Sequence, residues 1–137
     1  MLRPASIAAC LALICVLAAG CGARSSKPFT ATGSAACFTK KGFAKVTTDP
    51  LKVGFIAGFA DNGGLRATTS DGNLLTIAFT LDDTAVPSTE AAFRAHAPAS
   101  LRPRMNDIME SERNAVLVWT TSPSPQQLDD AKSCLHP

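Results

Sequence analysis

The stretch LRATTSDGNLLTIAFTL, residues 65–81, decides the fold of this chain. Apolar and polar side chains alternate over residues 65–69, and Asp71-Gly72-Asn73 follows with residues that favour a tight turn. The alternation then resumes, with one side of residues 74–81 carrying Leu75, Ile77, Phe79 and Leu81. Two alternating runs joined by such a turn predict an antiparallel hairpin that buries one face.

Two further strands are predicted outside this hairpin. Residues 43–48 precede Asp49-Pro50, a pair that ends extended segments, and read as the first strand. Residues 115–119 (AVLVW) form a continuous apolar run, which suits a strand covered on both faces. The hairpin therefore has candidate partners on both sides.

Helices are predicted between and beyond the strands. We expect a short helix over residues 35–41, capped by Ser34, and another that opens at Pro87-Ser88 and ends at Pro98. Apolar residues at helical spacing extend the helical reading through residues 98–113, so Ser111 is expected on a solvated helix. A last helix begins with a capping box formed by Ser124 and Gln127, with proline at its first position.

The order of elements predicts an α+β fold. The predicted order is helix, strand, hairpin, helix, strand and helix. These elements pack most economically as a mainly antiparallel sheet with the helices on one face, an arrangement of the ferredoxin-like kind. The chain has 137 residues, of which 46% are hydrophobic and 18% charged, which allows one small domain. Its formal net charge of +2, with one Trp and no Tyr, gives no sign of a nucleic-acid partner.

The amino terminus carries a targeting signal. A short positive start is followed by an apolar run of 15 residues, Ala5 to Ala19. As a helix this run reaches only about 23 Å, less than the roughly 30 Å of a bilayer core, so it predicts a secretory signal peptide. The run leads into Leu17-Ala18-Ala19-Gly20-Cys21, which resembles the lipobox of bacterial lipoproteins. The whole chain is similar to small uncharacterised lipoproteins of high-GC Gram-positive bacteria.

This resemblance implies cleavage before Cys21 and acylation of its thiol by lipid chains such as palmitate. It divides the chain into a signal peptide (1–20), a lipidated cysteine with a polar tether (21–34) and an α+β domain (35–137). It implies a lipid anchor in the cell membrane, with the domain on the extracytoplasmic side of the cell envelope. The alternative is an ordinary secreted protein that is cut after Ala19 or Gly20.

The cysteine count predicts one disulfide bond. Of the five cysteines, Cys10 and Cys15 lie in the signal peptide and Cys21 is the lipidation site, so Cys37 and Cys134 remain. An even number of cysteines in an oxidising compartment favours a bond between them. A zinc pair or a reactive thiol are the alternatives, but no Cys-x-x-Cys spacing supports zinc.

Residues 53–59 (VGFIAGF) are apolar in every direction and interrupted by glycine. They suit a strand or loop buried against the helices. They also suit an exposed apolar lip for a hydrophobic ligand, a partner protein or the bilayer, with contacts by Phe55, Ile56 and Phe59.

Chemistry-bearing motifs are few. The acidic pairs Asp82-Asp83 and Asp129-Asp130 lack the further acids of a calcium loop, and no metal site or cofactor is expected. His96 lacks a nucleophile in a recognisable motif. We therefore expect a non-catalytic binding or interaction module whose partner is an envelope protein or a small molecule. The alternatives are a carrier or chaperone of hydrophobic molecules that uses residues 53–59, and an envelope hydrolase that uses His96 with Asp82 or Asp83.

Overall fold

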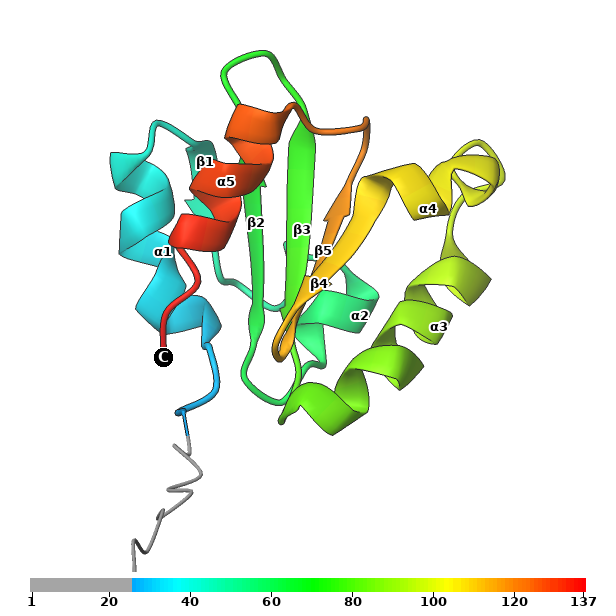
Figure 1. The fold of residues 1–137 in the computed structure, drawn as a ribbon, viewed down its shortest axis with the longest axis horizontal. Helices are drawn as coiled ribbons and strands as arrows, with labels where there is room; N and C mark the ends of the chain where they lie inside the picture. The colour runs from blue at the N-terminus through cyan, green and yellow to red at the C-terminus, as the bar shows by residue number, and fades with distance from the viewer. Residues whose placement is uncertain (1–25) are drawn as a thin grey trace, which may run out of the picture.

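The computed structural model describes residues 26–137, so the predicted signal peptide and Cys21 lie outside the described residues. The domain is α+β, with one antiparallel sheet in the strand order β1-β2-β3-β5-β4 (Figure 1). The strands are β1 (Ala44–Thr47), β2 (Gly64–Thr68), β3 (Leu74–Phe79), β4 (Met109–Glu112) and β5 (Ala115–Trp119). The helices are α1 (Ala31–Lys40), α2 (Phe55–Gly58), α3 (Val86–His96), α4 (Met105–Ile108) and α5 (Pro125–Ser133), with short 3-10 turns at Asp83–Ala85 and Arg102–Arg104.

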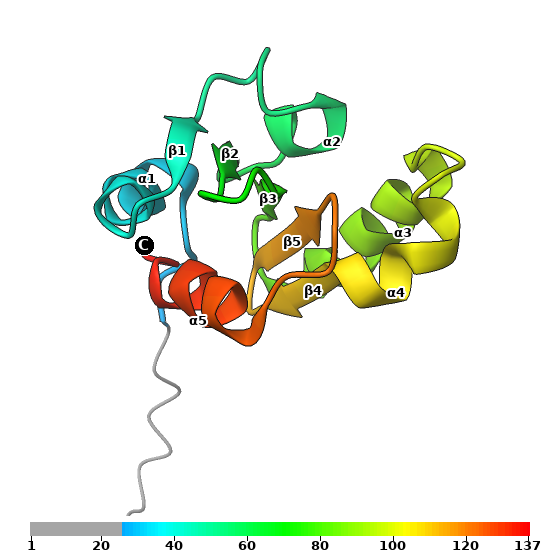
Figure 2. The same ribbon diagram turned by 90° about the horizontal axis from the view of Figure 1, so that it is seen from above.

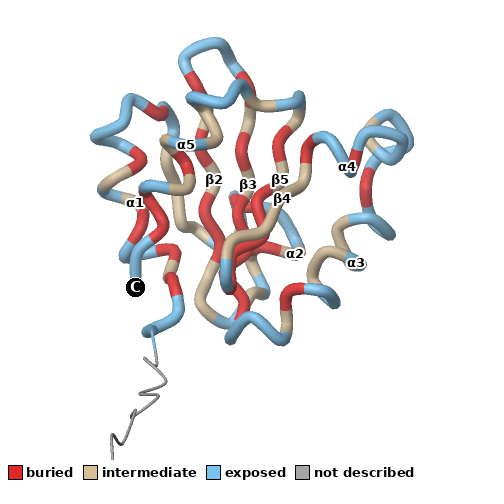
Figure 3. Tube along the Cα trace, in the orientation of Figure 1, coloured by how far each residue is buried: buried red, intermediate tan, exposed pale blue. Residues whose placement is uncertain are grey.

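The predicted hairpin is confirmed as β2 and β3, at the middle of the sheet. Leu65 pairs with Ile77 and Ala67 with Leu75, and all four side chains are fully buried. Figure 3 shows buried residues running along the middle strands of the sheet. The continuous apolar run that follows residue 114 forms β5, which pairs with β3 and is buried on both faces, as predicted.

Helices cover both faces of this sheet, so the prediction that they share one face is wrong. α1 and α5 pack on the face that carries Leu75 and Ile77, and α2 and α3 lie on the opposite face (Figure 2). Phe93 of α3 packs there against a small buried cluster formed by Val53, Ala57 and the β3 residue Ala78. Two of the three β3 residues on this second face, Thr76 and Ala78, are small, so its pattern is also typical of a solvated face.

Strand β4 replaces the second half of a predicted helix. Residues 109–112 pair with β5 from Met109 opposite Val118 to Glu112 opposite Ala115, so Ser111 lies on a strand and not on a helix. Its hydroxyl donates a hydrogen bond to the carboxylate of Glu90 on α3. The residues of MESE read as helical by local preference, and pairing with the apolar β5 overrides that preference.

The first helix begins earlier than predicted, and Ser34 is not its cap. The side chain of Thr30 accepts a hydrogen bond from the Gly33 amide at 3.0 Å, and Ser34 lies buried inside α1. The Ser34 hydroxyl instead accepts from the His136 amide at 3.0 Å. Phe29 is also buried, so the predicted tether (21–34) overlaps the folded domain from Phe29 onward.

A disulfide bond between Cys37 and Cys134 confirms the prediction from the cysteine count. It joins α1 to the end of α5, across a sequence separation of 97 residues. The predicted capping box at the start of α5 is also confirmed, with the Ser124 side chain accepting from the Gln127 amide at 3.2 Å. The two ends of the folded domain are thereby fixed side by side.

Candidate functional site

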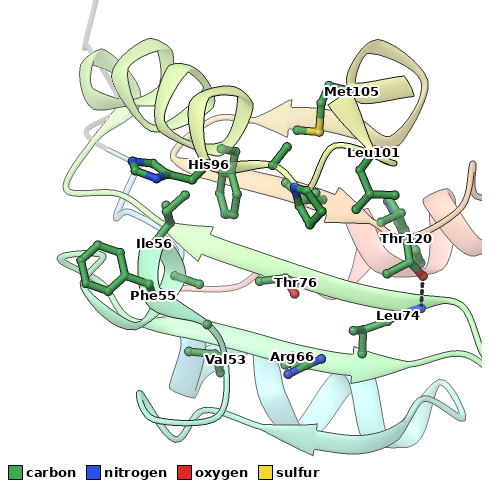
Figure 4. A pocket seen from close by; sticks show the side chains of 17 residues that line it. Val53, Phe55, Ile56, Arg66, Leu74, Thr76, His96, Leu101, Met105 and Thr120 are labelled. Atoms are coloured by element: carbon green, nitrogen blue, oxygen red, sulfur yellow. Dashed lines mark hydrogen bonds between the residues drawn. The ribbon is translucent and has the colours of Figure 1, made fainter. Parts of the chain in front are cut away.

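An apolar groove lies on the second face of the sheet, between α2 on one side and α3 with α4 on the other (Figure 4). Its volume is about 540 Å³, which falls within the range of small-molecule sites in proteins. The floor is formed by β3 and β5, with the side chains of Leu74, Thr76 and Val118. Among the lining residues only Arg66 and His96 carry ionisable side chains. The arrangement is suited to hold an apolar molecule.

The wall next to β2 is built by residues 53–57, within a segment that contains the short helix α2. Val53 and Ala57 are buried and pack on Ala78, and this contact fixes the helix on the sheet. Gly64 allows α2 to lie close to β2, because a Cβ at position 64 would lie 2.5 Å from the Ala57 carbonyl oxygen. Helix α2 therefore depends on a glycine in the neighbouring strand.

The outer side chains of α2 are exposed to an unusual degree for aromatic residues. Phe55 is 77% exposed and Phe59 is 80% exposed, and their ring centroids lie 5.0 Å apart. Phe55 and the half-buried Ile56 line the groove, whereas Phe59 is not among its lining residues. The segment is thus buried at Val53 and Ala57 and forms an exposed apolar lip at Phe55.

The opposite wall comes from the end of α3 and the start of α4. Ala97 and Met105 are buried, and Leu101 between them is half-buried. A hydrogen bond of 2.7 Å from the Arg94 guanidinium to the Asn106 side chain connects the two helices, and Arg102 Nε donates to the Ala97 carbonyl at 2.9 Å. These polar contacts connect residues on either side of the turn between α3 and α4, and the buried Ala97 and Met105 fix this wall on the core.

Arg66 was missed by sequence reasoning. Its position on β2 places it on the face opposite Leu65, which reads as solvated when no helix is expected there. In the structure it is half-buried at the end of the groove and also lines an adjoining hollow with Lys45 and Lys52. The only sequence signal was that Arg66 is the single cation within residues 65–81.

The groups of the hydrolase hypothesis do not come together. Asp82 precedes α3 and His96 ends it, so the 11 residues of this helix separate them by roughly 16 Å along its axis. The hydroxyl and amide of Thr84 donate to the Asp82 carboxylate at 2.5 and 2.9 Å. These bonds hold the pKa of Asp82 below its ordinary value, and the bond from the Thr84 hydroxyl contributes most to the shift. Asp82 thus caps the 3-10 turn that follows it.

In the second acidic pair, one residue, Asp130, also has a structural role. Asp130 accepts hydrogen bonds from the Gln126 amide group and the Lys41 ammonium, both at 3.0 Å, and these contacts lower its pKa. Within residues 26–137, no group of three or more His, Cys, Asp or Glu side chains is placed to hold a metal ion. None of the helices in that range is both long and apolar enough to cross a membrane.

The chain matches no protein-family model, and neither a curated protein nor a solved structure is significantly similar to it.

Proposed function

We propose that this protein is a lipid-anchored protein of the cell envelope whose domain binds an apolar molecule in the groove between α2 and α3. The observation that carries the binding role is the groove itself, about 540 Å³ in volume and floored by Leu74, Thr76 and Val118. Burial of apolar ligand surface there contributes roughly 25 cal/mol per Å². This is the carrier role that residues 53–59 suggest, performed without catalysis.

The anchor rests on the sequence from Leu17 to Cys21, with its small residues before the cysteine. Two or three acyl chains on Cys21 would hold the domain at the membrane, since each buried methylene contributes about 0.8 kcal/mol. A domain held there has direct access to apolar molecules of the envelope. Anchoring and ligand binding therefore support one another in this proposal.

The anchor predicts the intact mass of the protein purified from detergent-solubilised membranes. We expect a chain that begins at Cys21 and carries the added mass of acyl groups, and we expect two thiols to become alkylatable only after reduction. A Cys21→Ser variant is the matched control and should lose both the acyl mass and the membrane association. An unacylated wild-type chain recovered in the soluble fraction would contradict the anchor.

The binding role predicts different effects for two neighbouring phenylalanines. Phe55→Ser should weaken the labelling of the protein by a photoreactive hexadecanol about tenfold, because it removes an aromatic wall from the groove. Phe59→Ser is the matched control, since Phe59 directly follows the same helix and is equally exposed but lies outside the groove. Labelling is measured on the full chain in isolated membranes, and mass spectrometry of the peptides locates the attachment.

A second candidate function is protein docking through the exposed tip of α2. Leu51, a few residues before α2, is 94% exposed, and the rings of the exposed Phe55 and Phe59 lie 5.0 Å apart; exposed apolar side chains of this kind are typical of an interaction surface. A protein partner that covers this tip needs both phenylalanines. If Phe55→Ser and Phe59→Ser reduce the labelling, or the yield of a cross-linked partner, by the same factor, docking is favoured over ligand binding in the groove.

A further inference from the structure

Three cations surround one end of the groove. Arg66 lines both the groove and the adjoining hollow, and Lys45 and Lys52 line the hollow with it. Among the described residues that line this hollow there is no Asp or Glu. Asp49 pairs with Lys52 at 3.3 Å, so it offsets one of the three charges. The end of the groove therefore keeps a positive potential.

From this juxtaposition we infer that the ligand is a single-chain amphiphile with an anionic head group, whose tail fills the groove and whose head binds Arg66. The inference rests on the proposed function and adds the chemical class of the ligand. Figure 4 shows Arg66 on the same side of the groove as Val53 and Leu74, across the floor from Leu101 and Met105. The head and the tail thus have separate places.

Arg66 has hydrogen-bonding capacity to spare. Its Nη1 donates to the Lys52 carbonyl oxygen at 3.1 Å, and the other guanidinium donors have no partner in the part of the chain that the structure describes. A guanidinium presents its donors as a rigid fork that matches a carboxylate or a phosphate. The bond to Lys52 orients this fork, so little conformational entropy is lost when an anion binds.

The position of Arg66 also selects against neutral ligands. The side chain is half-buried, and a tail lying in the groove removes more water from it. A neutral chain would leave the guanidinium partly desolvated and without a counter-charge, which is unfavourable. An anionic head supplies charge-assisted hydrogen bonds instead, and it can remain partly hydrated in the open hollow. The same groove therefore discriminates hexadecanoate from hexadecanol.

The test compares photoreactive hexadecanoate with photoreactive hexadecanol on the full chain in isolated membranes. We expect hexadecanoate to label at lower concentration, and Arg66→Gln to reduce the ratio of hexadecanoate to hexadecanol labelling at least about tenfold. Arg66→Lys should restore part of this preference. Lys45→Gln, at an exposed position, should lower the ratio by a smaller factor without disturbing the sheet. Thr76→Phe, which fills the floor of the groove, should abolish labelling by both probes.

The possible outcomes separate the two proposals. If wild type labels with both probes equally, and Arg66→Gln and Lys45→Gln leave the ratio unchanged, the anionic head group is wrong while groove binding stands. If neither probe labels the groove peptides, both proposals fail. If labelling persists in Thr76→Phe, the probes bind elsewhere and the assignment to the groove is overturned.

Discussion

Replacing Cys37 and Cys134 together by alanine lowers the free energy of unfolding by about 4–5 kcal/mol. The disulfide closes a loop over a sequence separation of 97 residues, and the unfolded chain gains much conformational freedom when that loop opens. Such a loss is of the same order as the whole stability of a small domain. The double variant should therefore be largely unfolded at ambient temperature or only marginally folded.

The measurement is urea unfolding followed by the fluorescence of Trp119, the sole tryptophan, which is buried in the core. The urea titration of the wild-type protein is carried out with and without a reductant. The reduced protein should have the same free energy of unfolding as the double variant. Cys134 is fully buried, so alanine is used there because serine would add a buried hydroxyl. A loss below about 1 kcal/mol would contradict the entropic role assigned to the bond.

The second large effect is expected at Asn114, which holds the start of the folded domain. Its side chain accepts from the Phe29 amide at 2.8 Å and donates to the Phe29 and Thr80 carbonyl oxygens at 3.0 and 2.9 Å. Asn114 is 2% exposed, so water does not replace these bonds when the side chain is removed. Asn114→Ala should lower the free energy of unfolding by about 3 kcal/mol, because buried backbone groups lose their partners.

The matched control is Asn106→Ala on α4. Asn106 is exposed and makes its hydrogen bond with Arg94 at the surface, so its loss should change the free energy of unfolding by less than about 0.5 kcal/mol. Proteolysis gives a second readout, since Asn114→Ala should release the segment around Phe29 and expose it to cleavage. Equal stability of the two variants would show that Asn114 does not clamp this segment.

Much of the fold could be predicted because local patterns and tertiary packing agree there. The β2–β3 hairpin, the apolar strand β5 and the capping box of α5 each have a signal within a few residues. Strand β4 lacked one, because the local preference of MESE is helical and the turn that follows it, Arg113-Asn114, contains no glycine. Arg113 adopts a φ of +52° in this turn, and the presence of an arginine does not indicate this left-handed conformation.

The sequence predicted one wall of the candidate site and missed its floor and its cation. The apolar character of residues 53–59 pointed to Phe55 and Ile56, and both line the groove. Arg66 and Thr76 could not be found in this way, since their importance comes from α2 and α3 packing over a face that was expected to be uncovered. The place of Phe59 outside the groove likewise depends on the angle at which α2 lies on the sheet.

The sequence by itself determined the α+β class, the central hairpin and the Cys37–Cys134 pairing, because side-chain alternation, turn residues and an even cysteine count act locally or by number. Only the tertiary structure decided that helices cover both faces, that MESE is an edge strand and that Arg66 stands at the end of an apolar groove. The physical reason is that a groove is formed by the spacing between elements. That spacing depends on contacts between different elements, such as Ala57 of α2 against Gly64 of β2 and Phe93 of α3 against the cluster of Val53, Ala57 and Ala78.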